Sequence, residues 1–236
     1  MRKIFVNAYN FIGKLYLEPL LRLEQRKRPF QTINERPVEY SFAFTCLQRL
    51  CTGKILDIGS GQSSWPHLLS NCGYQITAID KIDLYWSHYF NRHYKILKDD
   101  IVQPQLQDKF QFATCLSVLE HIKDHQMAVN NVHQLLEKDG YLILTFPYNE
   151  HHYHGDIYKH PAARVDQQAS FITQIYSRNE INEWLTQTSF KIIEQTYYKV
   201  FSGELWAFGE RLMPSIQVEK TQLHHLTCLL LQKTRD

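Results

Sequence analysis

Short runs of apolar residues alternate with longer amphipathic stretches over most of the chain. Apolar runs of this length, bounded by glycine and polar residues, predict buried strands. We expect strands near 54–59, 75–80, 94–98, 110–117 and 140–146, and then at Lys191–Val200 and Leu226–Gln232. Apolar residues spaced three and four apart predict helices around and between these runs. The helices fall near Val38–Leu50, 65–72, 84–91, 124–137 and Arg178–Thr188.

The expected boundary between the helix near 124–137 and the next strand is Gly140. Residues 130–139 keep a helical spacing of apolar positions, and glycine is typical of a helix stop. Tyr141–Phe146 is then mostly apolar and predicts a buried strand.

Seven strands with helices between them predict an α/β protein built as a three-layer α/β/α sandwich. The 236 residues fit one domain with an appendage better than two domains. We therefore expect a Rossmann-like domain over residues 36–236, with a mostly parallel seven-stranded sheet, and a helical N-terminal appendage over residues 1–35.

The appendage is apolar-rich over residues 4–23 but is interrupted by polar side chains, Gly13 and Pro19, which makes it too polar to span a bilayer. A basic cluster, Arg22–Arg28, follows. The favoured interpretation is a helical cap packed on the following domain or on a partner subunit, as in a homodimer. Contact of residues 1–28 with a membrane surface is the less favoured alternative.

Composition is that of an ordinary enzyme of a reducing compartment, which predicts the cytoplasm. The hydrophobic content of 44% supplies a core, and the 13% of aromatic residues is enough to line a pocket as well. A net charge of +2 gives no electrostatic reason to expect nucleic acid as the main partner. The five cysteines are scattered without a Cys-x-x-Cys pair, which indicates buried thiols rather than a disulfide frame or a zinc site.

The segment Ile55–Gly61 joins an apolar strand to a glycine turn with Asp57 at the junction. Gly59 and Gly61 allow a sharp turn and a close approach to a ligand that a Cβ obstructs. A second apolar run ends in Asp80, 23 residues after Asp57. In a doubly wound sheet the first two strands are neighbours, so Asp80 would lie beside the glycine turn and accept both hydroxyls of a ribose. The pattern predicts a nucleoside-cofactor site.

The spacing distinguishes two classes of cofactor. A dinucleotide fingerprint requires Gly-x-Gly-x-x-Gly, whereas the chain runs Gly59-Ser-Gly-Gln-Ser-Ser64 and lacks the third glycine. Asp57 precedes the glycines, where it is badly placed for a pyrophosphate but well placed for a cationic sulfonium amino acid. S-adenosylmethionine is therefore favoured over a nicotinamide or flavin dinucleotide.

Three motifs occur in order: Leu56–Gly61, Ile79-Asp80 and Ser117–Ile122. On these motifs the chain resembles the class I S-adenosylmethionine-dependent methyltransferases, in their small-molecule branch. The resemblance covers about residues 54–148 by motif and 36–233 by layout. Ser63 departs from it, since the family often has a further glycine there. The resemblance implies an antiparallel last strand and S-adenosylmethionine as the cofactor.

The resemblance also implies the cofactor contacts. Asp57 would orient the methionine end, Asp80 the ribose (with Asp83 as a nearby competitor), and Asp100, preferred to Asp99, the adenine. Each carboxylate has an alternative role as a helix or turn cap. The expected cofactor-binding residues are Asp57, Gly59, Ser60, Gly61, Asp80, Lys81, Asp100, Ile101 and Ser117.

The acceptor side is expected around His121 and the loop that follows the fifth strand. His121 is a candidate general base because imidazole titrates near neutrality, and its alternative is a histidine bonded to backbone at a strand–helix junction. The loop Tyr148–His160 adds His151 and His154 as candidate bases. Alternatives for that loop are a divalent ion on His151, His154 and Asp156, which is not favoured, or a plain solvated loop. The expected acceptor contacts are Tyr40, Tyr148, Tyr153 and Trp206.

Three functions from different classes follow. The favoured one transfers a methyl group to an oxygen or nitrogen of a small molecule, of the natural-product (secondary-metabolism) or glycan type. The second is methyl transfer to a peptide, protein or RNA, supported only by the basic cluster Arg22–Arg28. The third is a non-catalytic cofactor-binding subunit.

Overall fold

A computed structural model describes residues 7, 11–19, 22, 34–61, 63–81, 94–163 and 171–235. The chain divides into two compact units, Met1–Asn34 and Glu35–Asp236. In the first unit residues 11–19 are helical. The helix expected near 84–91 and the competitor Asp83 lie outside the described residues. Within the described ranges, no helix is both long and apolar enough to cross a membrane.

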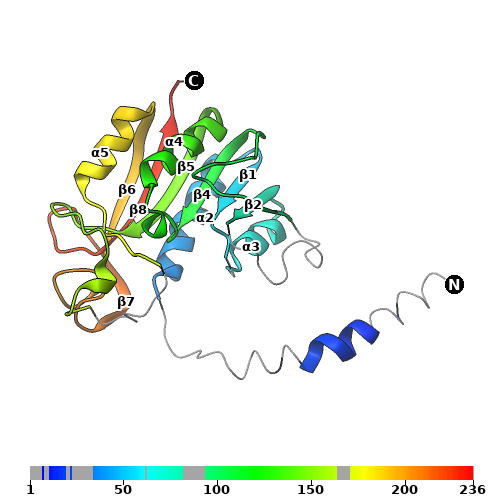
Figure 1. The fold of residues 1–236 in the computed structure, drawn as a ribbon, viewed down its shortest axis with the longest axis horizontal. Helices are drawn as coiled ribbons and strands as arrows, with labels where there is room; N and C mark the ends of the chain where they lie inside the picture. The colour runs from blue at the N-terminus through cyan, green and yellow to red at the C-terminus, as the bar shows by residue number, and fades with distance from the viewer. Residues whose placement is uncertain are drawn as a thin grey trace. The chain divides into compact units, whose positions relative to one another are not determined.

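The second unit is built on one eight-stranded sheet in the order β3-β2-β1-β4-β5-β8-β6-β7 (Figure 1). The first five strands in this order pair in parallel, and β8, β6 and β7 pair antiparallel with their neighbours. The antiparallel β8 is the last strand of the chain, as the family layout implies. The strands are β1 (Ile55–Ile58), β2 (Ile76–Asp80), β3 (Lys95–Lys98), β4 (Phe110–Leu116), β5 (Leu136–Pro147), β6 (Phe190–Phe201), β7 (Arg211–Val218) and β8 (Leu226–Lys233).

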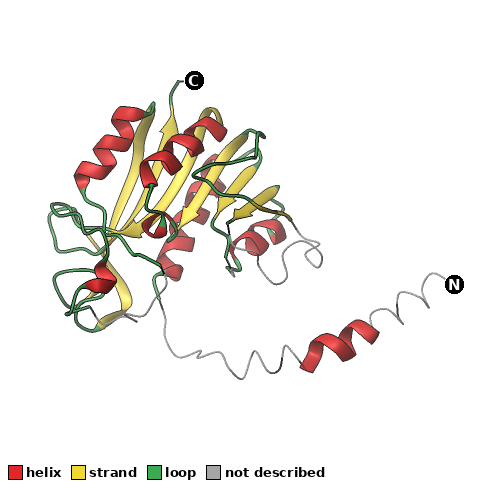
Figure 2. Cartoon of the chain, viewed as in Figure 1, coloured by secondary structure: helices red, strands yellow, loops and turns green. Residues whose placement is uncertain are grey.

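Helices cover both faces of the sheet and make the three layers that the sequence predicts (Figure 2). Short 3-10 turns η1 and η2 follow β4 and β5. The helical elements are α2 (Arg36–Leu50), α3 (Trp65–Asn71), η1 (Leu119–His121), α4 (His125–Leu135), η2 (Ile157–Lys159) and α5 (Arg178–Gln187).

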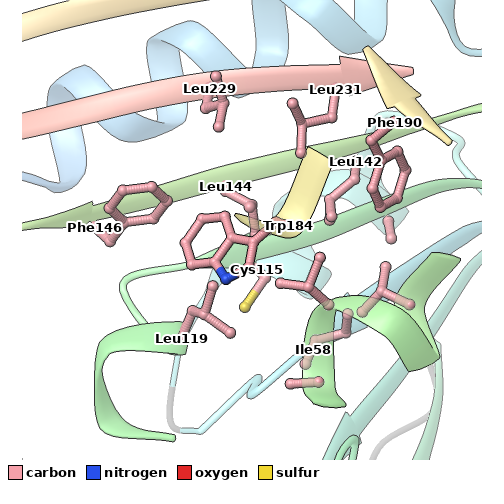
Figure 3. Close-up of a cluster of buried hydrophobic side chains, with 14 of the residues drawn as sticks. Ile58, Cys115, Leu119, Leu142, Leu144, Phe146, Trp184, Phe190, Leu229 and Leu231 are labelled. Carbon is pink, nitrogen blue, oxygen red and sulfur yellow. The ribbon is translucent and has the colours of Figure 1, made fainter. Parts of the chain in front are cut away.

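The two faces have separate hydrophobic cores because side chains alternate along each strand. In β5, Leu142 and Leu144 join the core beneath α4 and α5, whereas Ile143 joins the core beneath α2 and α3. Trp184 of α5 is fully buried in the first core, where it lies among Phe146, Leu144 and Leu119 (Figure 3). The elements that carry the site are therefore held between two packed layers.

The boundary expected at Gly140 is wrong: α4 ends at Leu135 and β5 begins at Leu136. Leu136 pairs with Phe110, and the register then shifts so that Tyr141 pairs with Phe112. A Cβ on Gly140 would lie 2.9 Å from the carbonyl oxygen of Gln111. The glycine is thus required by the close approach of two strands at an irregular pairing, not by a helix stop.

The sheet also has one strand more than predicted. β7 pairs only with β6 and lies at the edge of the sheet, with Met213 and Ile216 more than half exposed. An edge strand without a buried face lacks the continuous apolar run by which the other strands were predicted.

Candidate active site

Three parallel strands end side by side and open into one cavity. β1 pairs with both β2 and β4, so the carboxyl ends that carry Asp57, Asp80 and Ser117 meet at one edge of the sheet. The cavity there has a volume of about 730 Å³. Its lining includes every cofactor-binding residue expected from the sequence, together with Tyr40 and His121.

The glycine turn forms the floor of the cavity. Gly59 has φ +70°, and a Cβ there would lie 2.3 Å from Cγ1 of Val118. Gly61 has φ +49°, and its N–H donates to Oδ2 of Asp80 over 2.7 Å. The turn therefore needs glycine for its backbone angles and, at Gly59, for space.

Asp57 lies at the end of β1 and is 3% exposed. Its Oδ1 accepts a hydrogen bond from the Thr114 hydroxyl over 2.7 Å. Burial raises the pKa of Asp57 to about 7, against the lowering effects of the Thr114 bond and the Arg36 charge. Its environment therefore favours the protonated form more than solvent does.

Two neighbouring carboxylates after β3 have different partners. Asp99 accepts from the backbone N–H groups of Asp100, Gln105 and Leu106 and so organises its own loop. Asp100 instead pairs with Lys81, whose Nζ is 2.8 Å from its Oδ2. Both carboxylates line the cavity, and Oδ1 of Asp100 also accepts from the N–H of Val102.

A buried network joins α2 to the ends of β4 and β5. Glu39 is fully buried, and its Oε1 accepts from the hydroxyls of Ser117 and Thr145, the latter over 2.7 Å. Arg36 donates to Oε2 of Glu39 over 3.1 Å and to the carbonyl of Leu116 over 2.8 Å. Ser117 has φ +49°, a strained angle for a residue with a side chain. The network holds this strained residue and places Arg36 on the cavity wall.

An aromatic pair forms the wall between α2 and α3. Tyr40 stacks on Trp65 with ring centroids 4.8 Å apart, and its hydroxyl is 2.9 Å from the Ser63 hydroxyl. Both rings line the cavity. Tyr40 thus lines the cavity beside the glycine turn and α3, and its expected acceptor contact stays a prediction.

His121 lies at the opposite wall. Its Nδ1 is 2.8 Å from the carbonyl oxygen of Ile172, and its ring meets Phe171 edge-on at 4.7 Å. Because a carbonyl only accepts, Nδ1 carries the proton and Nε2 keeps the lone pair. Burial lowers the pKa of His121, which favours the neutral form. The adjacent Glu120 is buried, and burial raises its pKa well above the usual range.

The loop after β5 lies outside the cavity lining. Tyr148 is 1% exposed and donates its hydroxyl to Glu150 over 2.7 Å. The hydroxyl of Tyr153 donates to Gln174 over 2.6 Å, and the indole of Trp206 donates to Glu35 over 3.2 Å. The acceptor contacts expected for these three residues stay predictions.

The loop histidines are also absent from the cavity lining, which includes His121. His151 is exposed, and its N–H donates to the side chain of Asn149. His154 pairs through its backbone with Ile175. Asp156 pairs with Lys159. Over the ranges that the structure covers, no three histidine, cysteine or acidic side chains group as metal ligands.

The family model described as a methyltransferase domain matches residues 14–195. The chain belongs to the class I S-adenosylmethionine-dependent methyltransferases. Its curated methyltransferase relatives include two ubiquinone biosynthesis O-methyltransferases. The one from Alkalilimnicola ehrlichii is 26% identical over 126 residues, 50% of each chain, and the one from Haemophilus ducreyi is 24% identical over 130 residues, 50% of this chain and 54% of its own. The chain thus spans about half the length of these relatives.

Solved methyltransferases share the fold at low identity. The 1,6-didemethyltoxoflavin-N1-methyltransferase of Burkholderia thailandensis, solved with 1,6-didemethyltoxoflavin and S-adenosylhomocysteine, has a TM-score of 0.59 and 13% identity, with coverage of 99% of this chain and 90% of that chain. A methyltransferase from Methanosarcina mazei has a TM-score of 0.58 and 19% identity, with coverage of 80% of this chain and 97% of that chain. These matches show a methyltransferase fold.

The residues of the cavity fit the cofactor of this family. Two glycines at positive φ, the carboxylate of Asp80 and an apolar wall that includes Ile79, Ile101 and Val118 suit a nucleoside. Sequence reasoning missed Arg36 and Phe171, which also line the cavity. Arg36 was missed because it precedes the first predicted helix without a motif, and Phe171 because it lies between predicted elements.

Proposed function

We propose that this chain transfers a methyl group from S-adenosylmethionine to a hydroxyl oxygen of a small-molecule acceptor, with His121 as the general base. The observation that carries the proposal is that His121, with its basic nitrogen left unprotonated, lines the same cavity as the glycine turn and Asp80. The name of the two curated relatives, O-methyltransferase, supports oxygen as the methylated atom.

The chain's own residues divide into two groups in this proposal. Asp80 holds the ribose and Asp100 the adenine, while Asp57 and Arg36 carry the charges that suit the ammonium and carboxylate of an amino acid. Bound S-adenosylmethionine supplies a methyl group that is already activated as part of a sulfonium. The protein therefore has to bind and orient the two reactants and exclude water from them. Proximity and orientation lower the activation barrier by several kcal/mol, on the order of 7 in favourable cases.

The second group acts on the acceptor. Nε2 of His121 takes the proton from the acceptor hydroxyl, because the bond from Nδ1 to the Ile172 carbonyl fixes the tautomer. The same bond stabilises the imidazolium once the proton has moved. The lowered pKa of His121 keeps the base unprotonated at neutral pH.

The test is the single-turnover rate of His121→Asn at saturating acceptor, with His152→Asn as the matched control on the exposed loop. An asparagine side chain keeps a donor for the Ile172 carbonyl but has no basic nitrogen. We expect a loss of at least about 100-fold in rate. Cofactor affinity by calorimetry should stay within about twofold. The wild-type rate should fall as pH drops through a pKa below 6.5, and this dependence should vanish in His121→Asn.

A wild-type rate in His121→Asn across pH 6–9 would remove the base from the mechanism. If only amines are turned over, the methylated atom is nitrogen and not oxygen. Cofactor binding without turnover on any acceptor would favour the non-catalytic subunit, and methylated RNA or peptide would favour a macromolecular acceptor.

A further inference from the structure

A row of aromatic rings leads away from His121. Phe171 meets His121 edge-on at 4.7 Å, Tyr158 meets Phe171 at 5.7 Å, and Trp206 lies 6.3 Å from Tyr158. The three aromatic residues come from separate parts of the chain: the segment before α5, the turn η2 and the connection between β6 and β7. The row (Phe171, Tyr158 and Trp206) was therefore not visible in the sequence.

Phe171 is the member of the row that faces the cavity. It lines the cavity and is 50% exposed, although a phenyl ring gains free energy when it is buried. It is also covalently adjacent to Ile172, whose carbonyl orients His121. One backbone segment thus presents an apolar ring and fixes the base beside it.

The far end of the row is anchored by charge. Oε1 of Glu35 accepts from the Trp206 indole over 3.2 Å and from Arg211 over 2.6 Å. Arg211 in turn lies over the ring of Phe201, 4.7 Å from its centroid. Glu35 directly precedes Arg36 on the cavity wall. The β6–β7 hairpin, which carries the extra strand, is therefore tied to the helix that borders the cavity.

From this geometry we propose that Phe171 binds the acceptor and that the acceptor is a planar aromatic hydroxyl compound, with Tyr158 and Trp206 as positioning residues behind Phe171. The proposal rests on the proposed function for its hydroxyl and its base. An aromatic acceptor packs edge-on or offset against Phe171 and places its hydroxyl at His121.

The strength of the base favours the same class of acceptor. A phenolic hydroxyl has a pKa of about 10, whereas water, as a guide to aliphatic alcohols, has one of about 15.7. Burial lowers the pKa of His121, so this base is matched far better to a phenol than to an alcohol.

The experiment compares aromatic acceptors with saturated ones of the same size: phenol and catechol against cyclohexanol and cyclohexylamine. Turnover is followed as release of S-adenosylhomocysteine, and binding by ligand-observed NMR in the presence of S-adenosylhomocysteine. The variants are Phe171→Leu and Phe171→Tyr, with Phe208→Leu as the control. Phe208 lies in the β6–β7 hairpin, as Trp206 does, but its ring packs on His160 and is not part of the row.

We expect at least tenfold higher kcat/KM or affinity for the aromatic members. In Phe171→Leu the acceptor KM should rise about tenfold while cofactor affinity stays within twofold. Phe171→Tyr and Phe208→Leu should both keep the acceptor KM of the wild type.

Equal or absent preference for the aromatic members, or an unchanged acceptor KM in Phe171→Leu, overturns the proposal. If the wild type releases S-adenosylhomocysteine equally with saturated acceptors, methyl transfer stands and the aromatic site falls. If aromatic compounds bind through Phe171 but no acceptor is turned over, the site stands and the proposed function falls.

Discussion

Two regions at the carboxyl edge of the sheet are rich in carboxylates and aromatic rings. One is the cavity over β1, β2 and β4, and the other is the cluster around Glu150 at the end of β5. Glu150 receives hydrogen bonds from Tyr148 and Arg178 and pairs with Lys220 at 3.1 Å. Burial acts to raise the pKa of Glu150, but these partners outweigh it and lower the pKa to about 2.

Two buried carboxyls are in the opposite condition: Asp57, which lines the cavity, and Glu120, which precedes His121 in the chain. Asp57 has a pKa raised to about 7, chiefly by burial. Oε2 of Glu120 is buried without a hydrogen-bond partner among the described residues. A carboxylate whose acceptors are filled by the protein adds stability, whereas one left short of partners is available to a ligand. A buried carboxyl with a raised pKa, such as Asp57, is therefore a stronger sign of a ligand site than a fully partnered one such as Glu150.

The largest effect is expected at Glu39, a fully buried carboxylate of α2 whose acceptors are filled by the protein. Glu39→Ala leaves the buried hydroxyls of Ser117 and Thr145 and the charge of Arg36 without their acceptor. We expect a loss of about 3 kcal/mol in the free energy of unfolding. Urea denaturation measures this loss. Glu150→Ala, whose charged partners Arg178 and Lys220 reach solvent, should cost about 1 kcal/mol. An equal cost would mean that burial does not separate the two regions.

Next in size is the effect of a methyl group on the glycine turn. Gly59→Ala places Cβ against Val118 and forces a side chain to φ +70°. We expect cofactor affinity by calorimetry to fall at least tenfold, about 1.4 kcal/mol. Adding Val118→Ala to the Gly59→Ala variant should restore part of the cofactor affinity.

Gly155→Ala is the matched control in the loop after β5. Its Cβ would meet Tyr153 at 3.7 Å, an ordinary contact, so affinity should not change. Loss of affinity in Gly155→Ala would connect that loop to the cofactor.

The pH dependence of stability should have opposite slopes in the two regions. Between pH 2 and 4.5 the folded chain keeps Glu150 ionised while the unfolded chain protonates it, so the stability it adds is complete above 4.5 and is lost as pH falls toward 2. Between pH 3.8 and 7 the folded chain retains the Asp57 proton and the unfolded chain does not, so stability falls as pH rises.

Each slope is at most about 1.4 kcal/mol per pH unit. Urea denaturation of Glu150→Gln and Asp57→Asn from pH 3 to 8 separates them. Glu150→Gln should flatten the acid limb, and Asp57→Asn should flatten the limb between 3.8 and 7. Unchanged curves in both variants would show that these groups do not titrate as their surroundings require.

The smallest effect is expected at the mouth of the cavity. Lys81 pairs with Asp100, but its side chain is 77% exposed. Lys81→Ala should change cofactor affinity by less than about threefold and leave the free energy of unfolding nearly unchanged. The surface pair of Arg49 and Glu194 gives the reference for stability. A larger loss of affinity would make Lys81 a direct contact.

The sequence predicted the parts of the fold and site that depend on local order along the chain. The three-layer architecture is confirmed, and the glycine turn, Asp80 and Ser117 were placed at one edge because parallel strand ends must meet there. Phe171 and Arg36 escaped prediction because only tertiary packing brings them to His121 and Asp57. Tyr148 follows β5 as the sequence predicts, but its burial against Glu150 depends on tertiary packing that the sequence does not show, and its acceptor contact stays a prediction.

The assembly of the cavity from β1, β2 and β4 has a consequence for folding. Its walls come from residues as distant as Arg36 and Phe171, and its floor exists only after β1 has paired with both β2 and β4. Such non-local pairings close slowly, whereas β6 and β7 join through a short connection. Cofactor affinity should therefore be the last property to return during refolding. A bound cofactor would stabilise only chains whose parallel pairings are complete.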